Sequence, residues 1–256
     1  MLLAVGNVET YPLLNSMKLI ANDQTQQHEW HKVYPQGTYI HHDGWGAVSY
    51  KDDQWQVDRS PLAFPLDPAT RNLPITPSFL LLHLRRKSAG ECALENTHPF
   101  QIIHNNTQFF FAHNGHISVP ITFNQQFQTK GCTDSEKLLY AILSNSHFGT
   151  DPAQAISQVI EQYPAVHGSN MILSCPDWSL VALAPAAYQR YFTMHLGKNA
   201  QQTIICSEPL SSQADLEWQQ LKPGSICFLD HKTQTFTITP LGAMPNILTN
   251  YITYMP

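Results

Sequence analysis

Short apolar runs separated by polar turns dominate the chain. Each run has the length of a single strand, and Gly, Pro, Asn and Asp residues gather between the runs. The pattern predicts strands at residues 2–6, 46–50, 79–84, 108–113, 170–174, 179–183, 203–206, 225–229 and 235–238.

Two segments carry apolar residues at the three- and four-residue steps of a helix, each behind a start signal. One opens with Thr133-Asp134-Ser135-Glu136 and the other with Asp151-Pro152. A weaker pattern predicts a third helix over residues 12–21. Many strands and few helices indicate an α+β fold in which helices cover stacked sheets.

Composition narrows the class of protein. With 256 residues and 43% hydrophobic content, the chain is expected to be one globular domain spanning residues 1–256. A net charge of −5 without any basic run excludes nucleic acid and anionic membrane as default partners. The longest apolar run, 79–82, is too short to span a bilayer, and no signal peptide is recognisable. Five cysteines without a CxxC pair predict reduced thiols in the cytoplasm.

Polar and glycine residues interrupt the apolar runs at a few places. The Gly-Trp-Gly sequence at 44–46 predicts a turn with a buried tryptophan and a close backbone approach. Arg85, after the most apolar strand, is either a fork for a carboxylate, with Ser88 assisting, or part of a solvated basic loop. His98, in front of a proline, is interpreted as a structural hydrogen-bonding residue.

Two further motifs have a structural and a functional interpretation each. Asn114-Gly115 after an aromatic strand predicts either a tight hairpin turn or an oxyanion hole formed by the Asn114 amide and the Gly115 N–H. Thr133 and Glu136 predict a helix cap with a capping box. That cap leaves Asp134 free to hold a ligand ammonium group.

The order and spacing of these motifs resemble the class II glutamine amidotransferases. The match runs from Gly-Trp-Gly through His-x-Arg, Asn-Thr-His-Pro-Phe and His-Asn-Gly-x-Ile to Thr-Asp-Ser-Glu, and it continues in 170–174, 208–210 and 222–224. The closest resemblance is to the small, stand-alone branch of the family. It implies a four-layer αββα sandwich of the N-terminal-nucleophile hydrolases.

The resemblance also implies roles for individual residues. Arg85, assisted by Ser88, would bind the α-carboxylate of glutamine, and Asp134 would bind its α-ammonium. Asn114 and Gly115 would form the oxyanion hole for the tetrahedral intermediate. A zwitterionic amide substrate needs such a set of one cation, one anion and two hydrogen-bond donors. No cofactor and no metal are implied.

The chain departs from the family pattern at its N-terminus. The family begins Met-Cys-Arg, and the cysteine, freed of the initiator methionine, attacks the amide with its own α-amino group as base. Here the sequence reads Met1-Leu2-Leu3-Ala4-Val5-Gly6, with no Cys, Ser or Thr before Thr10. Either a Met-Cys-Arg start is missing from the sequence, or the protein is a relative that binds a ligand without turning it over. The retained Arg85, Asn114, Gly115 and Asp134 favour the first explanation.

Three functions follow in order of preference. The first is hydrolysis of the γ-amide of glutamine or of a γ-glutamyl conjugate of a small molecule. About 27 residues follow Leu229, too few for a synthase domain, so ammonia transfer would need a separate synthase subunit. The second is non-catalytic binding of glutamine or glutamate. The third, a metal-dependent hydrolase, is suggested by 13 histidines but lacks HExxH or CxxC spacing.

Overall fold

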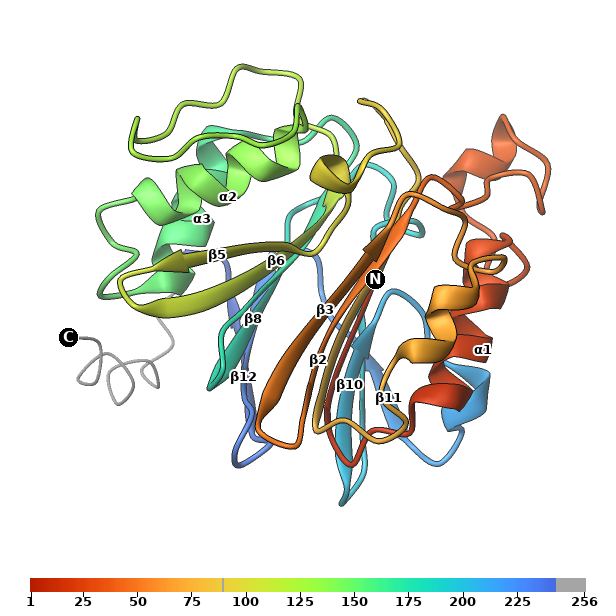
Figure 1. Cartoon of the computed structure of the whole chain (residues 1–256). Helices are drawn as coiled ribbons and strands as arrows, with labels where there is room; N and C mark the ends of the chain where they lie inside the picture. The colour runs from red at the N-terminus through yellow and green to blue at the C-terminus, as the bar shows by residue number, and fades with distance from the viewer. Residues whose placement is uncertain (89, 243–256) are drawn as a thin grey trace. The chain divides into compact units, whose positions relative to one another are not determined.

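The computed structural model describes residues 1–88 and 90–242, which fall into two compact units (Figure 1). Unit 1 comprises residues 1–99 and 188–221, and unit 2 comprises residues 100–187 and the segment from 222 onward. Each unit is one antiparallel sheet with helices packed on it, so each is described by itself.

The sheet of unit 1 has seven strands in the order β11-β9-β10-β1-β4-β2-β3. All of its neighbouring strands are antiparallel. The strands are β1 (Leu2–Gly6), β2 (Trp45–Lys51), β3 (Gln54–Ser60), β4 (Phe79–Leu84), β9 (His195–Lys198), β10 (Gln202–Cys206) and β11 (Glu217–Gln220); the helices are α1 (Thr10–Ala21), η1 (Glu29–Lys32), η2 (Pro68–Asn72), η3 (Leu94–Asn96) and η4 (Ser211–Gln213).

The core of unit 1 lies between one face of this sheet and α1. Alternate residues of the central strands, such as Leu2, Leu82 and Ile204, meet Leu13 and Met17 of the helix, and all five are fully buried. Residues of β1 and β4 that point to the opposite face are buried as well. Burial on both faces explains why these strands are continuous apolar runs instead of alternating ones.

The sheet of unit 2 has six strands in the order β13-β12-β8-β7-β6-β5, again antiparallel throughout. The strands are β5 (Phe100–His104), β6 (Thr107–Gly115), β7 (Ser169–Ser174), β8 (Trp178–Leu183), β12 (Ser225–Asp230) and β13 (Phe236–Pro240), and the helices are α2 (Asp134–Ser144) and α3 (Pro152–Gln162).

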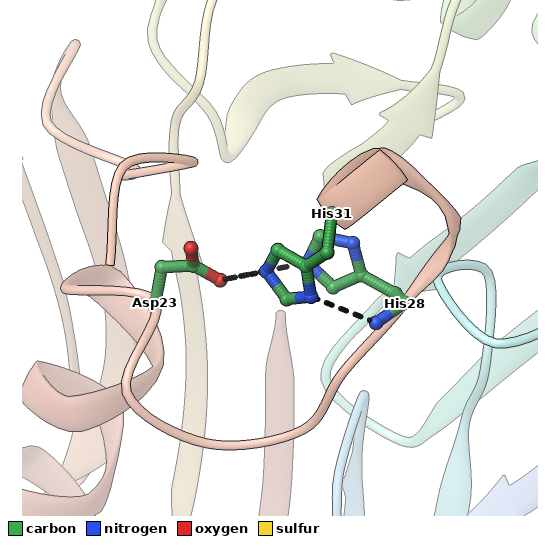
Figure 2. A group of neighbouring side chains, drawn as sticks. All are labelled: Asp23, His28 and His31. Atoms are coloured by element: carbon green, nitrogen blue, oxygen red, sulfur yellow. Dashed lines mark hydrogen bonds and ion pairs between the residues drawn. The ribbon is translucent and has the colours of Figure 1, made fainter. Parts of the chain in front are cut away.

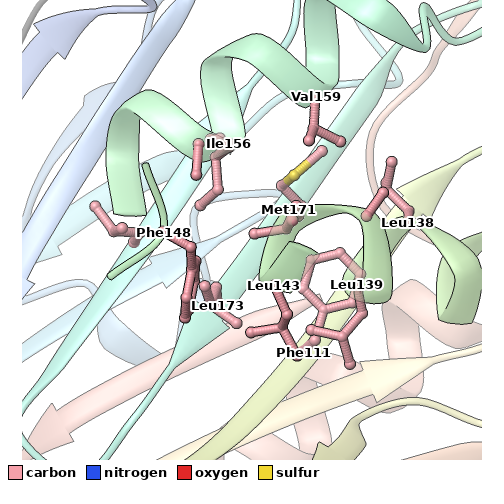
Figure 3. Close-up of a cluster of buried hydrophobic side chains, with 14 of the residues drawn as sticks. Phe111, Leu138, Leu139, Leu143, Phe148, Ile156, Val159, Met171 and Leu173 are labelled. Carbon is pink, nitrogen blue, oxygen red and sulfur yellow. The ribbon is translucent and has the colours of Figure 1, made fainter. Parts of the chain in front are cut away.

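Both helices of unit 2 cover the same face of its sheet (Figures 1 and 3). In Figure 3, Leu139 of α2 and Ile156 of α3 point toward Phe111, Met171 and Leu173 of the strands, and each of these side chains is at most 1% exposed. Burying a side chain of this size contributes about 1.5–3 kcal/mol. This cluster fixes α2, and therefore Asp134, against β6.

All strands and helices predicted from the sequence are present, with ends shifted by a few residues. Four strands were missed: β3, β5, β9 and β11. Three of them lie at sheet edges, where exposed polar residues interrupt the apolar pattern. Among the described residues, no helix has the length and apolar character needed to cross a bilayer.

The hairpin predicted at Asn114-Gly115 is absent. Both residues belong to β6, where Asn114 pairs with Asn170 and Gly115 with Ser169 of β7. The turn between β5 and β6 is instead made by Asn105 and Asn106, whose φ values of 49° and 60° suit a two-residue hairpin turn. The structural interpretation of Asn114-Gly115 as a turn is therefore wrong.

Candidate active site

Three of the predicted site residues lie together in unit 2, at the end of β6 and the start of α2. Asn114 and Gly115 end the strand, and Asp134 is the first residue of the helix. The Asp134 carboxylate accepts a hydrogen bond from the backbone N–H of Ile117 at 2.6 Å. That bond ties the helix start to the chain just beyond Gly115, so the predicted oxyanion pair and the predicted ammonium anchor lie in one structural group.

The buried side chain of His113 connects the elements that carry this group. His113 is 2% exposed, and its two ring nitrogens contact the hydroxyls of Ser135 and Ser169 at 2.9 Å each. Burial lowers the pKa of His113 to about 4, against the nearby charge of Asp134, which raises it. The ring is therefore neutral at pH 7, and it links β6 to the first turn of α2 and to β7.

Gly115 allows the backbone to lie close to this histidine. A Cβ built on Gly115 would lie 2.5 Å from Nε2 of His113 and 3.1 Å from the carbonyl oxygen of Gly168. Neither neighbour can move easily, because the ring is bonded on both sides and the other contact is backbone. Glycine is therefore required at this position by packing in the free protein.

The cap of α2 agrees with the sequence in part. The Thr133 hydroxyl accepts from the N–H of Glu136 at 3.3 Å, as predicted. The Glu136 carboxylate accepts from the N–H groups of Lys130 and Gly131, both at 2.8 Å, and so anchors the preceding loop. Asp134 is not left free, as the sequence had suggested, because it accepts from the N–H groups of Ile117 and Ser135.

Arg85 lies in unit 1, directly after β4, and is 4% exposed. Its Nη1 donates to the backbone carbonyls of Asp43 and Glu91 at 3.1 and 3.2 Å. The alternative of a solvated basic loop is therefore wrong for Arg85, because its guanidinium is buried and oriented by two carbonyls. Ser88 is exposed, and its predicted role toward the ligand carboxylate stays a prediction.

The Gly-Trp-Gly motif and the motif at 95–98 pack and hydrogen-bond around the loop that carries Arg85. Trp45 is fully buried and donates to the Asp67 carboxylate at 2.9 Å, as the interpretation of a buried tryptophan predicts. A Cβ on Gly46 would overlap the carbonyl oxygen of His98. Asn96 donates to the same Glu91 carbonyl that accepts from Arg85, at 3.2 Å. These motifs position the loop that orients the guanidinium.

A second polar cluster in unit 1 has no counterpart in the sequence predictions. Asp23, directly after α1, faces His28 and His31 of the η1 region (Figure 2). The spacing Asp-x4-His-x2-His was the available signal, and it is weaker than HExxH because it lies outside a long helix.

The structure thus groups the predicted residues by unit. Asn114, Gly115 and Asp134 are joined by hydrogen bonds and pairing within unit 2, and Arg85 and Ser88 belong to the loop after β4 in unit 1. None of the three in unit 2 lines the cavity of about 780 Å³ beside α3, whose walls include Leu138, Ile160 and Tyr163. Their catalytic and binding roles remain predictions.

Comparison with known proteins identifies the family. Residues 27–170 match the family model of the class II glutamine amidotransferases. The chain is 33% identical over 105 residues to the glutamine amidotransferase-like protein YafJ of Escherichia coli (strain K12), a match covering 40% of this chain and 41% of YafJ. It is 29% identical over 154 residues to a similarly named protein of Haemophilus influenzae, covering 56% and 52%. The chain spans about half the length of the curated relatives it matches.

Solved structures agree on the fold. Glutamine phosphoribosylpyrophosphate amidotransferase from B. subtilis matches 94% of this chain and 49% of its own with a TM-score of 0.64 at 14% identity. A predicted glutamine amidotransferase from Pseudomonas aeruginosa PA01 matches 90% of this chain and 96% of its own with a TM-score of 0.57 at 17% identity. The fold is the αββα sandwich of the N-terminal-nucleophile type, as predicted. The chain belongs to the class II glutamine amidotransferases.

Proposed function

We propose that this protein binds glutamine or a γ-glutamyl conjugate of a small molecule and hydrolyses its γ-amide. The observation that carries the proposal is the linked group in unit 2, where the Asp134 carboxylate is bonded to the chain directly after Asn114 and Gly115. An amide substrate with a free ammonium group needs an anion and an oxyanion hole at a fixed separation, and rigid elements provide that better than loops.

The proposed roles follow from chemistry. The Asn114 side-chain amide and the Gly115 N–H donate to the oxygen that becomes negative when the amide carbon is attacked. Asp134 receives the substrate ammonium, and Arg85 with Ser88 receives the α-carboxylate. A cysteine thiolate would attack the amide carbon to form a thioester, and the C–N bond would break to release ammonia from glutamine or an amine from a conjugate. Water would then cleave the thioester to give the γ-carboxylate and the free thiol.

The attacking group must be a thiolate that the described residues do not offer. Leu2–Gly6 contains no thiol or hydroxyl, and Cys175, Cys206 and Cys227 are buried. Burial raises the pKa of all three thiols, that of Cys175 and Cys227 to about 12, so they are protonated at neutral pH. Cys92 and Cys132 are exposed but have no α-amino group of their own to act as base. Hydrolysis therefore depends on a cysteine placed ahead of β1.

The experiment compares two proteins, the chain as written and the same chain preceded by Met-Cys-Arg. Ammonia release from glutamine and from γ-glutamyl amides is followed by a coupled assay, and ligand binding by calorimetry. The extended protein should release ammonia, and Asn114→Ala in it should reduce the rate about 10²–10³-fold. Binding by both proteins without any release would favour the alternative, a non-catalytic glutamine- or glutamate-binding relative.

Peptide mass spectrometry of the protein from its natural host identifies the native first residue. A start at cysteine two residues before Met1 would support catalysis. A separate synthase subunit that receives the ammonia remains a prediction from sequence, testable by co-purification with the native protein.

A further inference from the structure

The cavity beside α3 lies entirely within unit 2 and has a volume of about 780 Å³. Its walls come from α2, α3, β7 and the segments around Pro185 and Gly224, and the last described residue, Gly242, lies at one side. Pockets that bind small molecules measure about 300–1,000 Å³. The cavity therefore has room for a small ligand, and it is separate from the group formed by Asn114 and Asp134.

The inner wall of the cavity is apolar. Leu138 of α2 and Met171 of β7 are both buried and lie between the helices and the sheet (Figure 3). Ile160 of α3 and Ala165, which pack against the same buried core, extend this wall. The apolar body of a ligand placed here would lose contact with water over much of its surface, which is the main favourable contribution to binding in such pockets.

The outer wall of the cavity is the polar face of α3. Its side chains are at positions i, i+3, i+4 and i+7 of the helix, a spacing that places them on one side: Gln154, Ser157, Gln158 and Glu161. The first three are half-buried, and Glu161 is exposed. Ser157 and Gln158 are already hydrogen-bonded within the protein. A ligand would therefore first meet the side chains of Gln154 and Glu161.

The charge of this outer wall is negative. Glu161 is the only charged side chain among the described residues that line the cavity. It lies in the last turn of α3, where the helix dipole adds partial negative charge, and that turn contains no basic residue. Because Glu161 is exposed, its carboxylate lies at the mouth of the cavity. The mouth therefore attracts a cation and repels an anion.

We propose that this cavity binds a small molecule with an apolar body and a single ammonium group. The body packs against Leu138 and Met171, and the ammonium lies beside the Glu161 carboxylate at the mouth. The side-chain carbonyl of Gln154 accepts a further hydrogen bond from the same ammonium. This ligand class differs from glutamine, because the α-carboxylate of glutamine would meet no basic side chain among the described residues of the wall.

The test titrates the full chain with three probes of similar shape: 2-phenylethylamine, 2-phenylethanol and phenylacetate. In calorimetry the amine should bind with a Kd of about 1 mM or tighter, as expected for a fragment of this size in an apolar pocket. The alcohol should bind about 2–5-fold more weakly because it lacks one exposed ion pair, and phenylacetate more weakly still. In NMR of ¹³C-methyl methionine, the Met171 signal should shift on binding, and that of Met17 in unit 1 should not.

Matched variants decide whether the probes occupy this cavity. Glu161→Gln should remove the preference for the amine over the alcohol without weakening binding of the alcohol. Glu217→Gln, at an exposed position of β11 in unit 1, should keep that preference. Ala165→Phe places a larger side chain in the cavity and should abolish binding of all three probes. Circular dichroism shows whether each variant is folded, and Glu161→Gln changes an exposed side chain that folding does not require.

Three results would overturn the proposal: no binding of any probe at about 10 mM, equal affinity for the amine and phenylacetate, or an unmoved Met171 signal. An undiminished preference for the amine in Glu161→Gln would do so as well. None of these readouts requires glutamine or ammonia release, so the result stands apart from the proposed amide hydrolysis.

Discussion

The Asn114–Asp134 group of unit 2 and the Asp23 cluster of unit 1 are built in opposite ways. The first stands on regular elements, the end of β6 and the first turn of α2, with His113 bonded between them. The second stands on loops and a short 3-10 helix, brought together by backbone N–H groups from residues distant in sequence. The first group carries two motifs that were recognised in the sequence, whereas the Asp23 cluster lies within nine consecutive residues that match none of those motifs.

The group in unit 2 should respond strongly to acid through His113. The folded-state pKa of His113, about 4, lies below its unfolded value of 6.5, so the unfolded chain takes up a proton first and stability falls as the pH falls from 6.5 toward 4. Between pH 7 and 4.5 this histidine alone should account for about 2–3 kcal/mol of lost unfolding free energy. Urea unfolding across that range should give a flatter profile for His113→Gln and an unchanged one for His147→Gln. Parallel profiles for His113→Gln and the unchanged chain would contradict the assignment.

Gly115→Ala should destabilise unit 2. Its Cβ would meet His113 and the Gly168 carbonyl, so we expect a loss of about 1–3 kcal/mol from overpacking and a loss of glutamine binding. Gly149→Ala is the matched control, because a Cβ there meets nothing within 4 Å. Unfolding free energies and calorimetric titration measure both effects. Equal stability of the two variants would show that the β6 end is more pliable than its contacts indicate.

Exchanging one carboxylate in each region should separate the two regions. Asp134→Asn removes the predicted ammonium anchor and should weaken glutamine binding about 10–100-fold, the value of a charge-assisted hydrogen bond. Asp23→Asn should leave glutamine binding unchanged and lower the free energy of unfolding, because the carboxylate that accepts from Gly37, Tyr39 and His31 loses its charge. Calorimetric titration and urea unfolding of both variants measure the two effects, and weaker glutamine binding by Asp23→Asn would contradict the separation.

The smallest expected effect concerns the loop that carries the Asp23 cluster. The Arg86 guanidinium lies 3.7 Å from the ring centroid of Tyr39, so Arg86→Lys should cost about 0.5–1 kcal/mol through a poorer cation–π contact. Hydrogen exchange of the amides of Gly37 and Tyr39 should become faster. Arg71→Lys, on the exposed end of η2, should leave this exchange unchanged, and an equal change in both variants would exclude a local role for the stacking.

The edges of the sheets show where sequence patterns stop being informative. Buried strands such as β4 and β7 were recognised because each contains a continuous apolar run and all of their residues are buried. Edge strands such as β3 and β11 carry exposed polar residues, and only pairing with a neighbour makes them strands. The Asn-Gly signal failed for the related reason that pairing with β7 overrides the local turn preference.

By itself, the sequence predicted an α+β fold through its apolar periodicity, and the resemblance of its short motifs implied the family and its αββα sandwich, because periodicity and motifs are local properties of the chain. It also identified Asn114, Gly115 and Asp134 as candidates of one group. Only the tertiary structure decided that Asp134 accepts a hydrogen bond from the N–H of Ile117, just beyond Gly115. It also decided that Arg85 is buried and oriented by two carbonyls, and that Asp23 lies beside His28 and His31. The contacts of Asp134 and Arg85 are made to backbone groups that every amino acid shares, and a backbone partner leaves no mark in the sequence.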